Sequence, residues 1–203
     1  VSYSLYNRFT RGILLRSVSG LSCVSKELAE APVFRDFQQP TRVIANGIDL
    51  NKFSSIGAPN NSVPRIVFIG TPGYYWQGED KLIDFARAFP DLQIEIVGYE
   101  RLDNHLTLPS NLKLHGYLKS EDYQKVMAQC DIGIGTLALH RKGMEEACPL
   151  KTRECLALGL PMILPYKDTD LDSLDVDFLL KIPNTENNII THGKLMRDFA
   201  YKM

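Results

Sequence analysis

Two glutamates, Glu146 and Glu154, stand eight positions apart in the stretch EEACPLKTRECLALGLPMI, residues 145–163. Between them lies Pro149, which suits the first position of a helix because its missing N–H group would have no partner there. Gly159 ends the expected helix, and the apolar residues after it are typical of a strand. Two carboxylates around the expected start of a helix need an explanation, because the backbone at this end of a helix favours a negatively charged ligand.

The expected helix offers an anion site at its beginning. The backbone N–H groups of Leu150, Lys151 and Thr152 have no partner within a helix that starts at Pro149. These groups and the helix dipole favour a bound phosphate, to which the dipole contributes about 0.3–1 kcal/mol. Lys151 adds a full positive charge in the first turn, where a cation is unfavourable to the helix itself. The pattern therefore predicts a negatively charged ligand at this point.

The two glutamates suit a particular ligand around that phosphate. Glu146 is expected in the loop just before the helix, and Glu154 in its second turn. Carboxylates accept hydrogen bonds, so each could hold hydroxyl groups of a sugar that is attached to a diphosphate. One sugar would be a ribose and the other a hexose, which is the outline of a nucleotide-sugar site. Two solvated or capping residues are the alternative interpretation of this spacing.

From residue 65 onward, strand-like and helix-like segments alternate along the chain. The expected strands are 65–70, 92–98, 111–116, 131–137, 161–165 and 178–182, and the expected helices include 80–89, 120–130 and about 185–201. Ser120 is the expected N-cap of the helix over 120–130. This alternation indicates an α/β fold, in which a mostly parallel sheet has helices on both faces. Ligands bind such sheets at the carboxyl ends of the strands. The loops at those ends follow Gly70, Gly98, Gly116 and Leu137.

The beginning of the chain is organised differently. It holds a basic helical patch, two short strands and a short helix, and a stretch rich in Ser, Asn, Pro and Gly follows. We interpret residues 1–50 as the remnant of a separate domain and residues 51–64 as an interdomain linker. Residues 65–203 then form the nucleotide-sugar-binding domain.

Composition excludes several classes of protein. The 203 residues are 44% hydrophobic and 23% charged, as in an ordinary globular domain, and the formal net charge of −1 argues against a dedicated nucleic-acid binder. No apolar run approaches the roughly 18 residues that span a bilayer. The four cysteines form no C-x-x-C pair and have no histidine at metal-ligand spacing, which favours buried free thiols in a reducing compartment. Because the chain starts at Val1 without a signal peptide, we expect a segment of a longer cytoplasmic protein.

Four blocks of the sequence resemble one family in the right order. They are GLSCVSKELAE, RVIANGIDLNKF, LHGYLKSEDYQKVMAQCDIGIGTL and EEACPLKTRECLALGLPMI. The family is that of the GT-B glycosyltransferases, and specifically their large retaining group called family 4. The second block is similar to its interdomain hinge, and the last to its E-x7-E region in the variant that carries PLK. The similarity extends over about residues 18–200.

The resemblance implies roles for individual residues. Glu146 matches the glutamate that contacts hydroxyl groups of the transferred sugar near the reaction centre, and Glu154 matches the one that holds the ribose. Leu150 and Lys151 match positions whose backbone N–H groups meet the diphosphate.

Three further positions and the overall reaction follow from the same resemblance. Gly70 matches a glycine where the chain passes close to the phosphates, and Tyr117 and Leu118 match the segment that borders the base. The family fold has two Rossmann-like domains, of which the C-terminal one binds the donor and the N-terminal one the acceptor. The sugar leaves its nucleotide with retention of configuration, and no bound metal is needed. The donor is a nucleotide-diphosphate sugar, and a glycan or a lipid-linked molecule is the acceptor.

The sequence departs from the family at its diphosphate clamp. Thr71 stands near the position of an arginine, and Gln77 stands where a lysine is expected. Charge-assisted hydrogen bonds contribute roughly 1.5–3 kcal/mol each, so the loss of two could weaken diphosphate binding by two or more decades. Arg141, Lys142 and Lys151 are the candidate replacement cations.

Some features allow two interpretations. The aromatic run YYW, residues 74–76, could stack on a base or a sugar, or it could pack against a neighbouring domain. The basic stretch YNRFTRGILLR, residues 6–16, could touch the inner face of a membrane, or it could pack on residues outside this chain. His115 and His140 are assigned no catalytic role, because a histidine near a strand end is more often paired structurally.

Three functions are compatible with these patterns. The first is the donor-binding part of a retaining hexosyltransferase, which by itself would bind nucleotides weakly and transfer nothing. The second is a catalytically degenerate GT-B domain that serves as a scaffold or partner of an active transferase. The third is a nucleotide-sugar epimerase of GT-B architecture, which would need further acid and base carboxylates.

Overall fold

The computed structural model describes residues 2–34, 38–102 and 107–203, with side chains from residue 10 onward. The chain divides into two compact units, Val1–Ala45 and Asn46–Met203. This division lies five residues before the expected boundary at 50/51, and the expected linker, residues 51–64, is grouped with the second unit. The Ile56 N–H group, for example, donates to the Leu158 carbonyl at 2.9 Å. The origin of the first unit as an acceptor-side domain remains a prediction.

The first unit is small and built around two strands. Its elements are helix α1 (Ser2–Ser17), strand β1 (Leu21–Cys23), helix α2 (Lys26–Ala29), the 3-10 helix η1 (Pro32–Phe34) and strand β2 (Thr41–Val43). The strands β1 and β2 pair in parallel. Ser25 caps α2, since its Oγ accepts from the Leu28 N–H at 3.2 Å. In α1, Ile13 and Leu14 are largely exposed.

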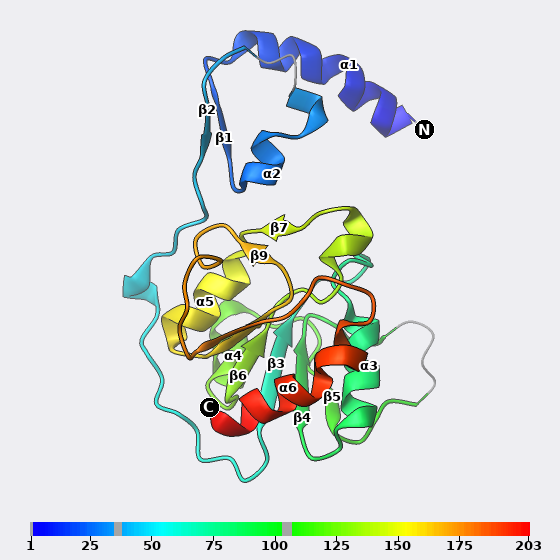
Figure 1. The fold of residues 1–203 in the computed structure, drawn as a ribbon, viewed down its shortest axis with the longest axis vertical. Helices are drawn as coiled ribbons and strands as arrows, with labels where there is room; N and C mark the ends of the chain where they lie inside the picture. The colour runs from blue at the N-terminus through cyan, green and yellow to red at the C-terminus, as the bar shows by residue number, and fades with distance from the viewer. Residues whose placement is uncertain (1, 35–37, 103–106) are drawn as a thin grey trace. The chain divides into compact units, whose positions relative to one another are not determined.

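The second unit contains a six-stranded sheet in which every neighbouring pair of strands is parallel (Figure 1). The strand order is β10-β8-β6-β3-β4-β5. The sheet strands are β3 (Arg65–Ile69), β4 (Gln93–Val97), β5 (Leu112–Leu114), β6 (Ile132–Ile134), β8 (Met162–Leu164) and β10 (Leu179–Lys181). The α-helices are α3 (Glu79–Ala88), α4 (Ser120–Met127), α5 (Leu150–Leu158) and α6 (Asn188–Lys202). Shorter elements are η2 (Leu50–Lys52), η3 (Leu139–Lys142), β7 (Glu146–Ala147) and β9 (Lys167–Asp168). The α/β fold with a Rossmann-like parallel sheet is thus confirmed.

Two apolar clusters hold helices against opposite faces of the sheet. Successive side chains of a strand point to opposite faces, so Ile66 and Phe68 join one cluster and Val67 joins the other. The first cluster contains the apolar side chains of α3 and α6, and the second contains those of α4 and α5. Burial of these faces is the main stabilising contribution, at about 25 cal/mol for each Å² of apolar surface.

Two helix starts differ from the sequence-based expectation. Ser120 is the first helical residue of α4 and not its N-cap, which is Lys119. Pro149 has extended backbone (φ −72°, ψ 141°) and is the N-cap of α5, so the helix begins at Leu150. A proline without an N–H group suits either position, because neither has an intrahelical donor to lose.

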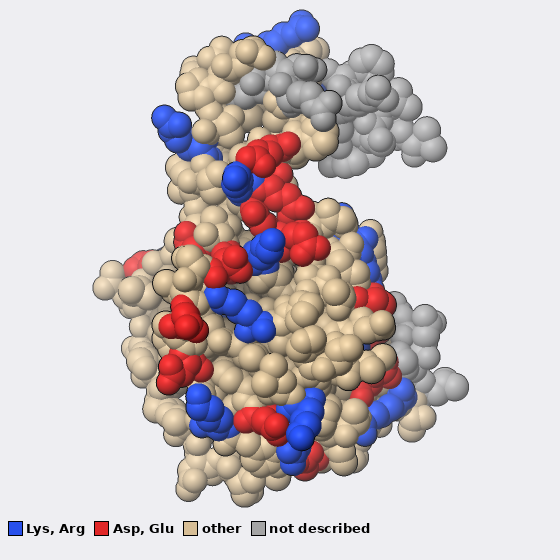
Figure 2. All heavy atoms as spheres, in the orientation of Figure 1, with Lys and Arg blue, Asp and Glu red and all other residues tan. Residues whose placement is uncertain are grey.

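The described residues contain no helix that is both long enough and apolar enough to cross a membrane. Over 2–34, 38–102 and 107–203 there is also no group of three or more His, Cys, Asp or Glu residues that could hold a metal ion. The four cysteines are free, and three of them are buried. Lys and Arg side chains lie among Asp and Glu side chains on the face of the second unit that Figure 2 shows, with uncharged surface between them.

Two glycines allow the carboxyl ends of β3 and β4 to come together. The Gly70 N–H donates to the Val97 carbonyl at 3.0 Å. Gly98 has a left-handed φ of 101°, and a Cβ atom there would overlap the Gly70 carbonyl oxygen. Only glycine tolerates both this φ and this close approach. The loops after the two strands therefore start from a tightly fixed edge.

Substitution of Gly98 tests this constraint. Gly98→Ala should lower the free energy of unfolding by about 2–4 kcal/mol, because the new methyl group meets backbone and the φ is strained. Chemical denaturation measures this change. Gly57→Ala is the control, since a Cβ at Gly57 meets nothing within 4 Å; it should change stability by less than about 0.5 kcal/mol. Equal effects of the two substitutions would contradict the description of this edge.

Candidate functional site

The N-terminus of α5 has no side-chain cap. Its N-cap residue Pro149 makes no side-chain cap hydrogen bond, so the first N–H groups of the helix lack this partner. Leu150 is 54% exposed there. The Thr152 side chain is fully buried, with its Oγ1 at 2.7 Å from the Tyr166 hydroxyl. The whole residue is 0% exposed, so neither the side chain nor the backbone N–H of Thr152 is open to a ligand in this structure, and the expected contact of Thr152 with the diphosphate is not seen.

Lys151 carries the positive charge of this helix start to the end of β3. Its Nζ donates to the Ile69 carbonyl at 2.8 Å and to Gln77 Oε1 at 3.3 Å, and it lies 4.6 Å from the centroid of the Phe68 ring. Burial lowers the pKa of Lys151 to about 8. No carboxylate of the described residues forms an ion pair with it. A half-buried cation without a counter-ion is unfavourable, so this position favours a bound anion.

Gln77 and Thr71, at the expected clamp positions, have other partners. Gln77 Oε1 accepts a hydrogen bond from the Lys151 ammonium group. Lys151 of α5 therefore places a positive charge beside the position where the family has a lysine. Thr71 is exposed, and its carbonyl accepts from the Tyr99 hydroxyl at 3.2 Å. Gly70 has a packing reason to be glycine, because a Cβ there would lie 2.5 Å from the Tyr99 ring and 2.6 Å from the Phe68 ring.

Glu146 lies on the short strand β7 rather than in an irregular loop. Residue Glu146 pairs with Lys167 in the parallel β7–β9 ladder and is half-buried. The next turn is held by Asn46, whose N–H donates to Cys148 Sγ at 3.0 Å and whose Nδ2 donates to the Cys148 carbonyl at 2.6 Å. Buried Arg153 also donates to Cys148 Sγ, at 3.1 Å. The backbone between Glu146 and α5 is thus fixed from several sides.

Glu154 is half-buried on α5, in the turn after Lys151. It lies next to Tyr123 of α4, whose pKa is raised mainly by burial and to a smaller extent by this carboxylate. The two glutamates therefore flank the start of α5 along the chain, on separate elements.

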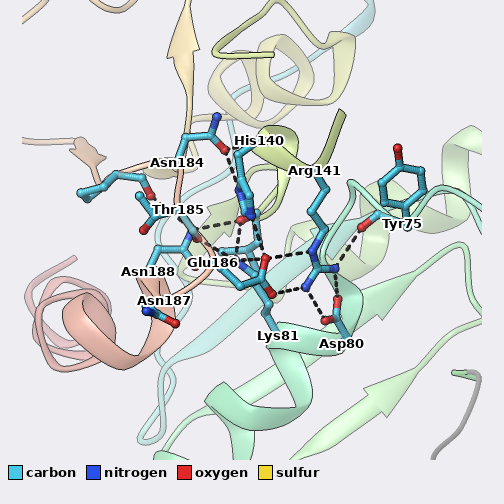
Figure 3. A network of polar contacts seen from close by, with 12 residues as sticks. Tyr75, Asp80, Lys81, His140, Arg141, Asn184, Thr185, Glu186, Asn187 and Asn188 are labelled. Atoms are coloured by element: carbon cyan, nitrogen blue, oxygen red, sulfur yellow. Dashed lines mark hydrogen bonds and ion pairs between the residues drawn. The ribbon is translucent and has the colours of Figure 1, made fainter. Parts of the chain in front are cut away.

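Arg141 is not available as a replacement cation for the clamp, because all five of its N–H groups already have acceptors (Figure 3). Asp80 accepts two of them at 2.8 and 2.7 Å, Glu186 accepts two at 3.0 and 2.5 Å, and the Tyr75 carbonyl accepts the fifth at 3.1 Å. Asp80 and Glu186 raise the pKa of Arg141, and Arg141 is the main cause that lowers the pKa of Glu186 to about 2. His140 joins the same network through Glu186, at 2.7 Å.

The other two basic or aromatic candidates lie at the surface. Lys142 is exposed, and its Nζ lies 4.7 Å from the centroid of the Trp76 ring. Tyr117 is 82% exposed. Leu118 is half-buried and packs on the apolar cluster of α4 and α5.

A hollow of about 550 Å³ lies where the loops after β3, β4 and β5 meet. Pro72, Gly73, Tyr99 and Tyr117 are among its lining residues, and so is Glu79 of α3, which the sequence interpretation did not single out. The loops after β3, β4 and β5 are three of the four loops where the sequence predicted a ligand, because ligands bind parallel sheets at the carboxyl ends of the strands. The only signal for Glu79 in the sequence is its place just after the clamp position, at the start of a helix.

Glu79 is an unusual member of this lining. Burial raises the pKa of its carboxyl group, and its Oε2 atom is buried without a hydrogen-bond partner among the described residues. The folded protein therefore binds a proton at Glu79 more tightly than the unfolded chain does. It follows that the folded state loses stability as pH rises from the ordinary value of 4.5 through the raised pKa.

A neutral replacement tests this description of Glu79. The gain in unfolding free energy on Glu79→Gln should be larger at pH 7 than at pH 4, because only the wild-type side chain must ionise in its buried position. Urea denaturation at the two pH values measures it. Glu121→Gln, in the exposed first turn of α4, removes the same charge and should show no such gain. The same effect of Glu79→Gln at both pH values would contradict the account.

Comparison with known proteins supports the fold. No family model matches the sequence, and no curated protein matches it. Solved structures do match. Sucrose-phosphate synthase from Thermosynechococcus elongatus has a TM-score of 0.65 at 15% identity, over 97% of this chain and 57% of its own. A glycosyltransferase from Rickettsia africae has a TM-score of 0.62 at 15% identity, over 99% of this chain and 59% of its own.

A third similar structure is the pneumococcal O-GlcNAc transferase GtfA in complex with UDP and GlcNAc. Its TM-score is 0.55 at 16% identity, over 100% of this chain and 40% of its own. This chain thus spans less than two thirds of the length of each of these proteins. At such low identity the likeness concerns the fold, and the chain has the fold of the GT-B glycosyltransferases, with the six-stranded Rossmann-like sheet as one half of it.

Proposed function

We propose that this chain is the donor-binding part of a retaining glycosyltransferase, which transfers a hexose from a nucleotide-diphosphate sugar to a glycan or a lipid-linked acceptor. The observation that carries the proposal is Lys151, a half-buried cation without a carboxylate partner among the described residues. It stands on a helix start without a side-chain cap, at the carboxyl end of the central strand β3. The bound diphosphate is the missing anion.

The diphosphate would receive two kinds of donor. The N–H groups of Leu150 and Lys151 supply fixed dipoles, and the Lys151 ammonium supplies a full charge. When the bond to the sugar breaks, negative charge grows on the departing phosphate oxygen. Preorganised donors stabilise that charge most in the transition state, which is how such a site accelerates the reaction. Because Lys151 supplies the charge, the proposal requires no bound metal.

The strand order arranges the remaining parts of the donor. Loops after β3, β4 and β5 form the hollow beside Tyr117, which suits the base. Lys151 lies over β3 in the middle, where the diphosphate would sit. The segment with Glu146 follows β6 on the other side of β3, so this carboxylate would orient the transferred sugar. Glu154 on α5 would hold the ribose hydroxyl groups.

The similar proteins support this assignment at the level of chemistry. GtfA, whose structure holds UDP and GlcNAc, shares the fold of the whole chain. An S. aureus TarM structure in complex with UDP and alpha-GlcNAc-glycerol matches at a TM-score of 0.59 and 14% identity, over 93% of this chain and 40% of its own. We infer a UDP-, GDP- or ADP-sugar donor and a polysaccharide-type product.

The place of action follows from the same proposal. Donors of this kind and free cysteines suit the cytoplasm. In α1, the exposed side chains of Ile13 and Leu14 stand among Arg11 and Arg16, which suits peripheral contact of the full-length protein with an anionic membrane surface.

Replacement of the half-buried cation tests the proposed function. Lys151→Met should weaken the binding of UDP, GDP or ADP by at least about tenfold, since a charge-assisted contact of roughly 1.5–3 kcal/mol is lost. Calorimetric titration of the purified chain measures this affinity. The melting temperature should not fall, because the substitution also removes an uncompensated, half-buried charge.

Two further variants sharpen the result. Lys125→Met removes the same charge from the exposed face of α4 and should leave nucleotide affinity unchanged. Glu154→Ala should weaken the binding of all three nucleotides, because each contains the ribose. If the wild-type chain bound none of the three, the scaffold function would replace this proposal. Unchanged affinity in Lys151→Met would refute the role of the lysine.

A further inference from the structure

The aromatic run Tyr74–Trp76 has no role in the donor site described so far. Its rings lie close together, with centroid distances of 4.5 Å between Tyr74 and Trp76 and 5.6 Å between Tyr75 and Trp76. Tyr74 is 44% exposed and Tyr75 is 59% exposed. Trp76 is half-buried and packs on the apolar cluster of α4 and α5, so it fixes the group to the protein.

The backbone beneath these rings is rigidly held. The Tyr75 carbonyl accepts from Arg141, and the Tyr74 carbonyl accepts from the Gln77 N–H at 2.9 Å. The Tyr75 ring points away from the Arg141 network (Figure 3). Arg141 is itself fixed by its two carboxylate partners, so the rings stand on a fixed loop. Preorganised aromatic rings lose little entropy when a ligand binds them.

An ammonium group completes the surface. Lys142 Nζ lies over the Trp76 ring, and its side chain is exposed. We call Tyr74, Tyr75, Trp76 and Lys142 the aromatic platform. It combines apolar ring faces with a hydrogen-bond donor, which matches the chemistry of a pyranose ring, with its C–H groups and its hydroxyl groups.

The position of the platform indicates that the pyranose ring belongs to the nucleotide-sugar donor. Gln77 directly follows the run and contacts Lys151, where the diphosphate is proposed to sit. Lys142 stands four residues before Glu146, which is proposed to orient the transferred sugar. The hollow proposed for the base is lined by the loops after β4 and β5 and by Pro72 and Gly73 of the β3 loop, whereas η3 with Lys142 follows β6, on the other side of β3. The tyrosines of the platform thus follow the β3 loop that the hollow shares, and Lys142 lies on the side of Glu146, where the transferred sugar is proposed to sit.

We infer that the aromatic platform binds the sugar ring of the nucleotide-sugar donor and contributes to the choice of sugar. This inference rests on the proposed function and extends it to a sugar subsite. Tyr74 and Tyr75 present ring faces to the C–H face of the pyranose, and Lys142 donates to one of its hydroxyl groups.

The test compares each nucleotide with its own sugar conjugate. Trp76 is the single tryptophan of the chain, so its fluorescence reports on the platform directly. Each ligand is titrated separately into the protein. The affinity for UDP is compared with that for UDP-glucose and UDP-GlcNAc, the affinity for GDP with that for GDP-mannose, and the affinity for ADP with that for ADP-glucose. At least one conjugate should bind more tightly than its nucleotide and change the Trp76 emission more. The double variant Tyr74→Ala/Tyr75→Ala and the variant Lys142→Met should each weaken the binding of that conjugate by about tenfold. They should weaken the binding of its nucleotide by less than about twofold.

A contrasting variant and the opposite results complete the design. Tyr117→Ala, in the hollow proposed for the base, should weaken the binding of the nucleotide and of its sugar conjugate by the same factor. If no wild-type conjugate bound more tightly than its nucleotide, or if the platform variants lost both ligands equally, this inference would be overturned and the proposed function would stand. A wild-type chain that bound no nucleotide would overturn the proposed function and this inference together. Melting curves of the variants establish that they are folded.

Discussion

The half-buried ammonium group of Lys151 is the interaction on which the rest of this account depends. A half-buried lysine that donates to a strand-end carbonyl and a glutamine amide, over a phenylalanine ring, has lost part of its hydration. Those partners are neutral, and burial lowers the pKa of the group to about 8. A chain that only had to fold would be more stable with an apolar side chain there. Retention of the charge is explained if a diphosphate neutralises it during function.

The surroundings of Lys151 serve to hold it and the nearby loops in place. The close approach of Gly70 and Gly98 fixes the strand ends from which the loops leave. Asn46 and Arg153 fix Cys148, and thereby the turn between Glu146 and α5. A second network, centred on Arg141, ties η3 to α3 and to Glu186 in the segment before α6. Sites that hold a ligand in one geometry need such supporting contacts.

Much of the fold could be predicted because its signals are local. Strand β3 is an apolar run and β4 alternates apolar and polar residues, and a glycine follows each of them. Helix α3 has a helical period of apolar residues, so the types of all three elements follow from the sequence. The two-residue strands β7 and β9 give no alternation and could not be predicted. Pro149 marked the start of α5 to within one residue, because a proline without an N–H group is tolerated at both the N-cap and the first helical position.

The site was predictable in its residue types but not in its contacts. Arg141 and Lys151 are equal candidates in the sequence, yet Arg141 meets Asp80 and Glu186, which lie 61 and 45 positions away. Lys151 meets Ile69, 82 positions away. Such long-range pairings decide which cation is neutralised within the protein and which is left for a ligand. No local pattern encodes them.

Proton exchange during binding tests the central claim most directly. If a diphosphate neutralises Lys151, binding raises the pKa of the lysine above its value of about 8 in the free protein. The chain should then take up roughly half a proton per bound nucleoside diphosphate at pH 8, as measured by calorimetry in two buffers with different ionisation enthalpies. Lys151→Met should take up none. Binding of a nucleoside diphosphate by the wild-type chain without proton uptake at this pH would contradict the account.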